Sequence, residues 1–440
     1  MWTESRRTAV ARAIRGAAAP VELGRVARIA GLLIEASVPD VSVGDVVEIL
    51  RPNGADSVHG EVVGFRDQVS QIIPIGEVRG LRPGALVRRE CRAGVPVGDA
   101  LLGRVVDAFG RPLDDLGPLR CAATAPLDRP APPVRDRARV TRRFDTGVRV
   151  IDALLTCGRG QRIGIFAGAG VGKSTLVEQI ALHSDADVIV FGLIGERGRE
   201  VRELMAAIPD RPIVAVAATS DKSPLERARG AQAATAIAEH FRDRGANVLL
   251  LLDSLTRYAM ALREIGLSAG EPPATKGYPP SVFAELPRLL ERVSPMAAGG
   301  SITAFYSVLV EGDDLADPIA DSARSLLDAH IVLSRELAAR GQFPAVDVLA
   351  SASRVAHQVT SRDAQDLAAE ARRTLAVRRE ADELRSLGAY VPGSNPTYDA
   401  AVASGERIDR WARQRVDEHS TFDDAMAGLR AAITGQETTA

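Results

Sequence analysis

Residues 163–175 read IGIFAGAGVGKST, and this stretch decides the fold class of the chain. An apolar strand pattern, Ile163–Phe166, precedes a glycine-rich loop, and a helical pattern begins at Leu176. Glycines let the loop backbone curl so that successive N–H groups point at phosphate oxygens, and the following helix adds the positive end of its dipole. The order of strand, loop and helix therefore predicts a phosphate-binding loop in an α/β fold.

The loop also supplies a cation and a hydroxyl with separate expected roles. Lys173 is expected to neutralise the β and γ phosphates of a nucleotide, and the Ser174 hydroxyl to take one position on Mg²⁺. The first motif position holds Ala167 in place of glycine, which departs from the strict pattern. The dinucleotide pattern G-x-G-x-x-G is absent from the loop. The expected nucleotide-binding residues of the loop are Gly168, Ala169, Gly170, Val171, Gly172, Lys173, Ser174 and Thr175.

Two carboxylates follow other strand patterns and are candidates for metal binding and catalysis. The apolar run Val248–Leu252 ends in Asp253, which is typical of a carboxylate that anchors the Mg²⁺ shell. The run Val188–Phe191 is followed by a loop that contains Glu196. Loops at the C-terminal ends of neighbouring parallel strands converge on the ligand, so Glu196 is the candidate for polarising the attacking water. An ordinary capping aspartate and a solvated loop carboxylate are the alternative interpretations.

Composition excludes several function classes. The chain has 440 residues and a formal net charge of -2, which gives no long-range attraction to nucleic acid or anionic lipid. No apolar run approaches the roughly 20 residues of a membrane-spanning helix, so a soluble protein is expected. The arginine pair Arg6-Arg7 is not followed by the uninterrupted apolar stretch of an export signal. Cys91, Cys121 and Cys157 lack metal or redox spacing, which fits a reducing cytoplasm.

The N-terminal part has two patterns. Val10, Ile14 and Ala17 recur at helical spacing among arginines, which predicts a short basic amphipathic helix. This helix is either a frayed tail or a docking helix for a partner protein. From Val21 to Arg92, short β-branched runs alternate with turn residues, which predicts a small closed or nearly closed β domain.

The remainder of the chain divides at a proline-rich connector, Ala125–Pro133. After it, apolar strand patterns alternate with helical segments such as Leu225–Arg244, which predicts a mainly parallel sheet covered by helices on both faces. From Ser361 the pattern is helical and charged, with its clearest helix at Leu367–Leu387. The expected strands are Arg162–Phe166, Asp187–Phe191, Ile213–Ala217, Val248–Leu252 and Ile302–Val308.

Longer motifs give a resemblance to a known family. Gly195–Glu200, together with the phosphate loop, resembles the catalytic subunits of rotary ATPases. Pro344–Asp347 and Ser351–Arg354 resemble the signature of the α and β subunits of F-type ATP synthase. Pro273–Phe283 and Leu286–Arg292 resemble the homohexameric branch, the flagellum-specific and type III secretion ATPases, and Val310–Asp314 and Pro318–Asp321 agree. Within this branch, Gly388–Tyr390 and Gly393–Pro396 look like the flagellar version. The resemblance covers nearly the whole chain from Val21 onward.

The resemblance implies a ring of six identical chains that bind ATP and Mg²⁺ between neighbours. Each chain would carry an N-terminal helix at 1–20, a β-barrel at 21–95, a RecA-like P-loop ATPase core at 96–360 and a C-terminal helical domain at 361–440. By motif position, Glu196 matches the catalytic carboxylate, Arg197 its neighbouring site arginine, and Arg354 an arginine finger supplied in trans. Phe343 occupies the position of an aromatic residue, often Tyr, that stacks on adenine, and Phe keeps that π face. Ala329 stands where the family usually has Gly, a change for which we have no account.

The implied function is an ATP-hydrolysing hexameric motor of a flagellar-type export apparatus that helps release or unfold substrates held by chaperones. The implied partners are further copies of the chain, a stator-like regulatory protein at the N-terminal helix, the export gate and chaperone–substrate complexes. Neither nucleic acid nor an integral membrane position is expected, and the implied location is cytoplasmic, peripheral to a membrane-embedded export apparatus.

Three other functions are weighed against this one. A β-type catalytic subunit of a proton-driven synthase would differ in assembling with a distinct α-like chain. A non-catalytic nucleotide-binding ring subunit is disfavoured by Glu196. An RNA-translocating hexamer is disfavoured by the net charge of -2 and by the absence of a basic aromatic stripe in the β region.

Overall fold

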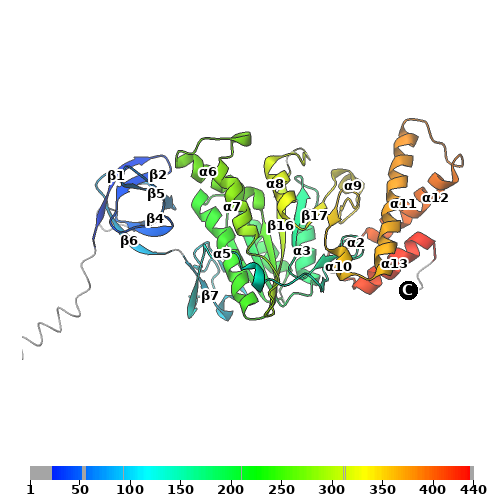
Figure 1. Cartoon of the computed structure of the whole chain (residues 1–440), viewed down its shortest axis with the longest axis horizontal. Coiled ribbons are helices and arrows are strands. Elements are labelled where there is room, and N and C mark those ends of the chain that lie inside the picture. Colours follow the sequence, from blue (N-terminus) through cyan, green and yellow to red (C-terminus); the bar gives the residue numbers. More distant parts are fainter. Residues whose placement is uncertain are drawn as a thin grey trace, which may run out of the picture. The chain divides into compact units, whose positions relative to one another are not determined.

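The computed structural model of the chain describes residues 22–51, 56–92, 94–209, 211–310, 312 and 314–436. These residues form two compact units (Figure 1). The first contains the described residues up to 92 together with Leu267–Glu271, and the second contains the rest. The amphipathic helix expected before Val21 lies outside the described residues.

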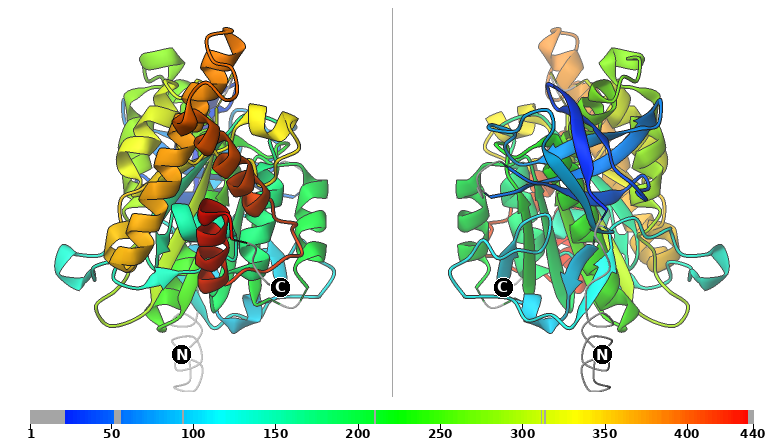
Figure 2. Two further views of the ribbon diagram at one scale, coloured as in Figure 1. Left: turned by 90° about the vertical axis from the view of Figure 1, so that its right-hand side faces the viewer. Right: turned by 90° about the vertical axis from the view of Figure 1, so that its left-hand side faces the viewer.

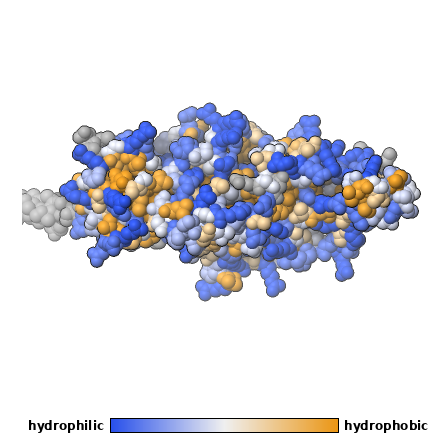
Figure 3. Space-filling model, turned by 90° about the horizontal axis from the view of Figure 1, so that it is seen from above, coloured by the Kyte–Doolittle hydropathy of each residue, from blue (hydrophilic) through white to orange (hydrophobic). Residues whose placement is uncertain are grey.

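The first unit is a closed antiparallel barrel, which confirms the expected β domain. Its strands follow the order β1-β2-β5-β4-β3-β6, and side chains that alternate along them fill the interior, as in Val47 and Ile49, both fully buried. Leu23, Val43 and Phe65 are 47%, 64% and 48% exposed, and Figure 3 shows hydrophobic side chains gathered on the barrel. The strands are β1 (Gly24–Ala30), β2 (Leu33–Ser37), β3 (Asp45–Ile49), β4 (Val58–Arg66), β5 (Val69–Ile75) and β6 (Leu86–Arg92).

Short elements lead from residue 94 to the central sheet. The proline-rich stretch begins inside β9, which pairs only with β7 in a two-stranded ribbon, a place where a missing N–H donor is tolerated. The elements are β7 (Gly94–Val97), η2 (Asp99–Leu101), β9 (Ala123–Pro126), η3 (Val134–Asp136), β10 (Arg143–Phe144), α2 (Arg149–Leu154) and β11 (Cys157–Gly158).

The second unit is built on an eight-stranded sheet of order β18-β17-β12-β16-β15-β13-β14-β8. Only β18 runs antiparallel to its neighbour. Continuous apolar runs form the inner strands because both faces are covered, which confirms the five expected strands. The strands are β8 (Arg104–Val106), β12 (Arg162–Ala167), β13 (Val188–Ile194), β14 (Ile213–Ala218), β15 (Asn247–Asp253), β16 (Ser301–Leu309), β17 (Ala329–Val332) and β18 (Ala352–Ser353).

Helices cover both faces of this sheet (Figures 1 and 2). The longest of them, α5, begins with a complete capping box between Ser223 and Glu226, followed by Pro224 at its first position. No helix in the described ranges is both long and apolar enough to cross a membrane. The helices are α3 (Lys173–His183), α4 (Gly198–Ala207), α5 (Pro224–Asp243), α6 (Leu255–Ser268), η4 (Thr275–Gly277), α7 (Pro280–Leu290), α8 (Pro318–Leu326), α9 (Arg335–Ala339) and α10 (Ala356–Val359).

The C-terminal helices are α11 (Arg362–Ser386), α12 (Pro396–Ala412) and α13 (Phe422–Thr434), and α11 contains most of the helix expected from Leu367. Leu367, Ala371, Ile408 and Leu429 belong to the same hydrophobic core cluster as the strands of the central sheet. The helices therefore pack into the core of the second unit. The predicted domain boundary at residue 360 stays a prediction.

Candidate active site

The phosphate loop connects the end of β12 to the start of α3. Gly170 and Gly172 have φ angles of 79° and 91°, a left-handed conformation that favours glycine. A Cβ atom on Gly172 would lie 3.2 Å from the ring of Phe343, so the loop also approaches this aromatic side chain closely. The backbone thus turns sharply at the N-terminus of α3, where its N–H groups have no intrahelical partner.

Three predicted site residues meet beside this loop. Lys173 Nζ forms an ion pair with Asp253 at the end of β15, and lies 3.8 Å from Glu196 Oε1 in the turn after β13. The strand order places β12, β16, β15 and β13 next to one another. Because these strands are parallel, their C-terminal ends lie at the same end of the sheet. The three side chains are only 10–12% exposed, which strengthens their electrostatic interactions.

Two residues that sequence reasoning missed lie against these carboxylates. Arg257 Nε lies 3.2 Å from Glu196 Oε1. Ser307 on β16 donates a hydrogen bond from its hydroxyl to Asp253. Burial and the charge of Asp253 raise the pKa of Glu196 to about 7, against the opposite effect of Lys173 and Arg257. The site therefore holds a carboxyl group that accepts a proton more readily than a solvated glutamate.

The two predicted metal-binding residues are a hydroxyl of the loop and a carboxylate at the end of β15. Ser174 is exposed in the first turn of α3, and Asp253 is buried and oriented by Ser307 and Lys173. Hydroxyl and carboxylate oxygens are the hard ligands that Mg²⁺ prefers, and Mg²⁺ commonly binds through one or two protein groups together with phosphate oxygens. Among the described residues there is no cluster of three or more His, Cys, Asp or Glu side chains that could hold a metal alone.

A cavity of about 630 Å³ opens next to the phosphate loop and α3. Phe343, which is 43% exposed, and Thr175 line one side of it. Residues 413–418, which follow α12, line the other side. Gln179 on α3 donates a hydrogen bond to the carbonyl oxygen of Arg415 at 3.1 Å, and this bond holds the segment against the helix. The cavity has the position and size for the base and sugar of a nucleotide whose phosphates lie in the loop.

Arg354 lies away from these groups, near the N-terminal ends of β12 and β17. Its backbone N–H donates to the carbonyl oxygen of Asp328. The adjacent Ser353 pairs with Ala329 of β17. Ala329 in turn pairs with Ile163 near the start of β12. At about 3.3 Å per residue, β12 separates this end of the sheet from the phosphate loop by roughly 17 Å. The exposed Arg354 side chain therefore cannot serve the phosphate loop of its own chain.

Family models match three parts of the chain. They are the nucleotide-binding domain of the ATP synthase alpha/beta family over residues 147–353, the beta-barrel domain of the same family over 26–90, and the T3SS EscN ATPase C-terminal domain over 360–431. Curated relatives extend over almost the entire chain. A flagellum-specific ATP synthase of Treponema pallidum is 47% identical and covers 94% of this chain and 93% of its own length.

The chain belongs to the family of flagellum-specific and type III secretion ATPases. A flagellum-specific ATP synthase of Pseudomonas aeruginosa is 46% identical over 98% of both chains. A type 3 secretion system ATPase of Xanthomonas euvesicatoria is 47% identical over 92% of both chains. The ATPase also matches the solved structure of the assembled ATPase EscN from enteropathogenic E. coli, with a TM-score of 0.88, 42% identity and coverage of 93% of this chain and 100% of that chain.

The remaining predicted residue of this ATPase, Arg197, is exposed and directly follows Glu196 at the start of α4. Arg257 lies in the first turn of α6, and no sequence pattern marks its contact with Glu196. No local pattern marks residues 413–418, which reach the site only through the packing of the C-terminal helices.

Proposed function

We propose that this chain binds ATP and Mg²⁺ at the phosphate loop and hydrolyses ATP only when a second copy supplies Arg354. The observation that carries this proposal is the separation of Arg354 from Lys173 by the length of β12. The chain contains every group that the proposed reaction needs, but these groups lie at opposite ends of the parallel strands. A head-to-tail arrangement of copies brings the two ends together.

Each residue then has a defined task in phosphoryl transfer. Loop N–H groups and Lys173 hold the β and γ phosphates, and Glu196 orients the attacking water and accepts its proton. Arg257 keeps the Glu196 carboxyl in place. Arg354 of the neighbouring copy stabilises the charge that develops on the transferred phosphoryl group. Arg197, beside Glu196, adds positive charge at the same end of the sheet.

Ser174 and Asp253 would hold the Mg²⁺ ion. The ion neutralises charge on the phosphate oxygens when it is bound. Asp253 forms an ion pair with Lys173. When this pair separates, Asp253 can bind the incoming metal ion and Lys173 can bind the phosphates. The Ser307 hydroxyl fixes the Asp253 carboxylate at this end of the sheet.

Phe343 and residues 413–418 would receive the base of ATP. The exposed ring provides a π face for stacking, which is sequence-tolerant and worth about 1–3 kcal/mol per base in nucleic-acid complexes. A base in this cavity would contact the C-terminal segment directly. Binding of nucleotide would thus act on the helices that follow it.

In the cell, the chain would form a homohexameric ring that energises a type III protein export apparatus. Its relatives support this role, and the flagellum-specific and the type 3 secretion system relatives have similar identities to this chain. Residues 388–396 favour the flagellar version. Export substrates with their chaperones, the export gate and a stator-like protein would be its partners. The ring would be cytoplasmic and peripheral to the membrane-embedded apparatus.

A mixing experiment tests the shared site. Lys173→Ala lacks the phosphate cation, and Arg354→Ala lacks the finger, so neither variant alone should hydrolyse ATP. In an equal mixture of the two, about a quarter of head-to-tail contacts combine an intact phosphate side with an intact finger. Hydrolysis measured as phosphate release should therefore return.

The matched control mixes Lys173→Ala with Glu196→Gln. Both changes lie on the same side of the contact, so every site in that mixture has a damaged phosphate side, and hydrolysis should stay absent. Equal recovery in the two mixtures, or full activity of Arg354→Ala alone, would contradict the proposal.

A further inference from the structure

Ser307 is a buried polar side chain in the middle of the central sheet. It lies on β16, which pairs with β12 on one side and with β15 on the other. Ser307 itself pairs with Ile165 of β12, and the neighbouring Tyr306 pairs with Leu252, the residue before Asp253. Ser307 therefore lies between the strand that leads to the phosphate loop and the strand that ends in Asp253.

The hydroxyl of Ser307 interrupts an apolar part of this strand. Strands that are covered on both faces are built mainly from apolar residues, and Ser307 is only 2% exposed. A buried hydroxyl is unfavourable unless it forms a hydrogen bond. Ser307 donates this bond to Oδ1 of Asp253. The hydroxyl thus acts directly on a residue of the ATP site.

A second serine of β16 forms a similar bond away from the site. Ser301, at the start of the strand, donates to the side chain of Asn247 at 3.1 Å, and Asn247 is the first residue of β15. Ser301 is also buried, with 4% of its surface exposed. The two serines join the same pair of strands at opposite ends, and of the two only Ser307 contacts a residue of the ATP site.

Ser307 and Lys173 contact the same oxygen of Asp253. The ammonium group of Lys173 forms its ion pair with Oδ1, which also accepts the hydrogen bond from Ser307. Neither contact involves Oδ2. On the proposed function, Lys173 moves to the phosphates, whereas the uncharged hydroxyl of Ser307 stays on Oδ1. A carboxylate held in this way presents its other oxygen in a fixed direction.

A fixed carboxylate distinguishes between divalent ions. Mg²⁺ requires nearly ideal octahedral geometry and usually keeps several waters, so one or two protein groups in fixed directions are sufficient. Ca²⁺ takes about six to eight oxygen ligands in a flexible geometry and often binds both oxygens of one carboxylate. The bond from Ser307 therefore favours Mg²⁺, and a carboxylate that is free to turn would accept Ca²⁺ more readily.

We propose that Ser307 is a positioning residue that makes the metal site select Mg²⁺ over Ca²⁺. The inference rests on the proposed function in one respect, which is the binding of the metal by Asp253. It does not depend on Arg354 or on assembly of a ring, because Ser307, Asp253 and Lys173 belong to one chain. Loss of the hydroxyl should weaken the binding of Mg²⁺ and leave that of Ca²⁺ nearly as it is.

Nucleotide binding gives a test that needs no hydrolysis. The probe is ADP with a fluorescent N-methylanthraniloyl group on its ribose, titrated with the full chain at increasing concentrations of Mg²⁺ or Ca²⁺. The quantity measured is the concentration of each ion that gives half of the metal-dependent increase in ADP affinity. The ratio of the two concentrations, Ca²⁺ to Mg²⁺, reports the selectivity of the site.

Two substitutions of similar shape isolate the hydroxyl. Ser307→Thr keeps it, whereas Ser307→Val replaces it by a methyl group. Loss of a hydrogen bond to a metal-binding side chain commonly lowers metal affinity about 10- to 100-fold. We expect Ser307→Val to raise the half-effective concentration of Mg²⁺ about tenfold and that of Ca²⁺ less than about threefold. Ser307→Thr should resemble the parent.

The matched control compares Ser301→Ala with Ser307→Ala, because each removes a buried hydroxyl that joins β16 to β15. Ser301→Ala should leave both concentrations unchanged, and Ser307→Ala should act like Ser307→Val. Alanine adds no atoms to the strand. Ser307→Ala therefore decides the outcome if the extra methyl group of Thr and Val disturbs the sheet.

Asp253→Asn separates failure of this inference from failure of the proposed function. If that variant keeps the Mg²⁺ dependence of the parent, the metal-binding role of Asp253 and the inference are both overturned. If it loses the dependence while Ser307→Ala keeps the selectivity of the parent, only the inference about Ser307 is overturned. An equal loss of affinity for Mg²⁺ and Ca²⁺ in Ser307→Ala would also overturn it, because the hydroxyl would then support the site without selecting the ion.

Discussion

Phe343 is a large apolar side chain that keeps 43% of its surface exposed beside the phosphate loop. We expect Phe343→Ala to raise the KM for ATP by about tenfold or more, because stacking of a base on an aromatic ring is worth about 1–3 kcal/mol. Phe343→Tyr keeps the π face and should leave KM nearly unchanged. Initial rates over a range of ATP concentrations check both. An unchanged KM in the alanine variant would remove Phe343 from the base site.

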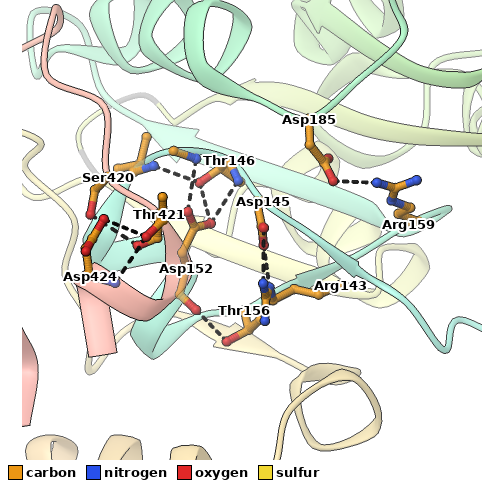
Figure 4. A network of polar contacts seen from close by, with 12 residues as sticks. Arg143, Asp145, Thr146, Asp152, Thr156, Arg159, Asp185, Ser420, Thr421 and Asp424 are labelled. Atoms are coloured by element: carbon orange, nitrogen blue, oxygen red, sulfur yellow. Dashed lines mark hydrogen bonds and ion pairs between the residues drawn. The ribbon is translucent and has the colours of Figure 1, made fainter. Parts of the chain in front are cut away.

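Asp152 is fully enclosed, and burial raises its pKa from the ordinary 3.8 to about 7 despite the hydrogen bonds it accepts (Figure 4). Between about pH 4 and 7 the unfolded chain has lost this proton while the folded chain keeps it. The folded state then binds more protons, so the contribution of Asp152 to stability falls as pH rises, by about 1.4 kcal/mol per pH unit at most.

Asp152→Asn should remove this pH dependence. The variant should be less stable than the parent at pH 5, because the amide nitrogen cannot accept the N–H of Gly147. The difference in the free energy of unfolding between the parent and the variant should become smaller toward pH 7. Urea unfolding of both proteins at pH 5, 6 and 7 measures it. A gap that stays constant would mean that Asp152 is ionised in the folded protein throughout.

Sequence reasoning found Lys173, Glu196 and Asp253 because each stands at a strand end or in a short loop whose chemistry is local. The parallel sheet then brings the three ends together without further information. Arg257 and Ser307 were missed because their roles are visible only in contacts with these side chains. Arg354 was found through a family signature, but its place at the far end of the sheet required the strand register.

At the scale of elements, the strands of the central sheet were predictable because burial on both faces produces continuous apolar runs. The run at Val188 extends to Ile194, three residues beyond its predicted end at Phe191, since glycine and leucine also fit a buried strand. The C-terminal helices were predictable as helices but not in their packing. Leu429 joins the central core, and Gln414 donates to the carbonyl oxygen of Gly147, through contacts between distant parts of the sequence.

A buried ion pair connects three other elements. Arg292, just after α7, pairs with Glu239 of α5 at 2.8 Å and donates to the carbonyl oxygen of Leu127 in the proline-rich connector, and both charged side chains are 3% exposed or less. Glu239→Gln leaves the buried guanidinium without a counter-charge. We expect a loss of about 3–5 kcal/mol in the free energy of unfolding.

Urea denaturation checks this value. The control is Glu336→Gln, which removes a carboxylate from an exposed ion pair with Arg340 and should cost less than about 1 kcal/mol. Similar losses in the two variants would mean that the buried pair contributes no more to stability than a surface pair.

Across the molecule, the central sheet of one chain has two unlike ends, the C-terminal and the N-terminal ends of its parallel strands. One carries the phosphate loop with Glu196, and the other carries Arg354. A contact between unlike surfaces leaves an unused surface at each end of any open assembly, and a ring removes both ends. On the proposed function, the division of the site between the two ends of the strands links hydrolysis to assembly, because each phosphate loop needs a neighbouring copy and a closed ring completes every site.

This link predicts that activity depends on protein concentration. Specific ATPase activity should rise with concentration and then level off, because dilution separates the copies that share each site. Arg354→Ala should stay near zero over the whole series, and Arg354→Lys should follow the rising curve at a lower level, since a point charge replaces a planar fork. Phosphate release and mass photometry on the same dilutions measure activity and assembly together. Flat activity across dilutions in which the assemblies separate would show that each chain completes its own site, against the placement of Arg354.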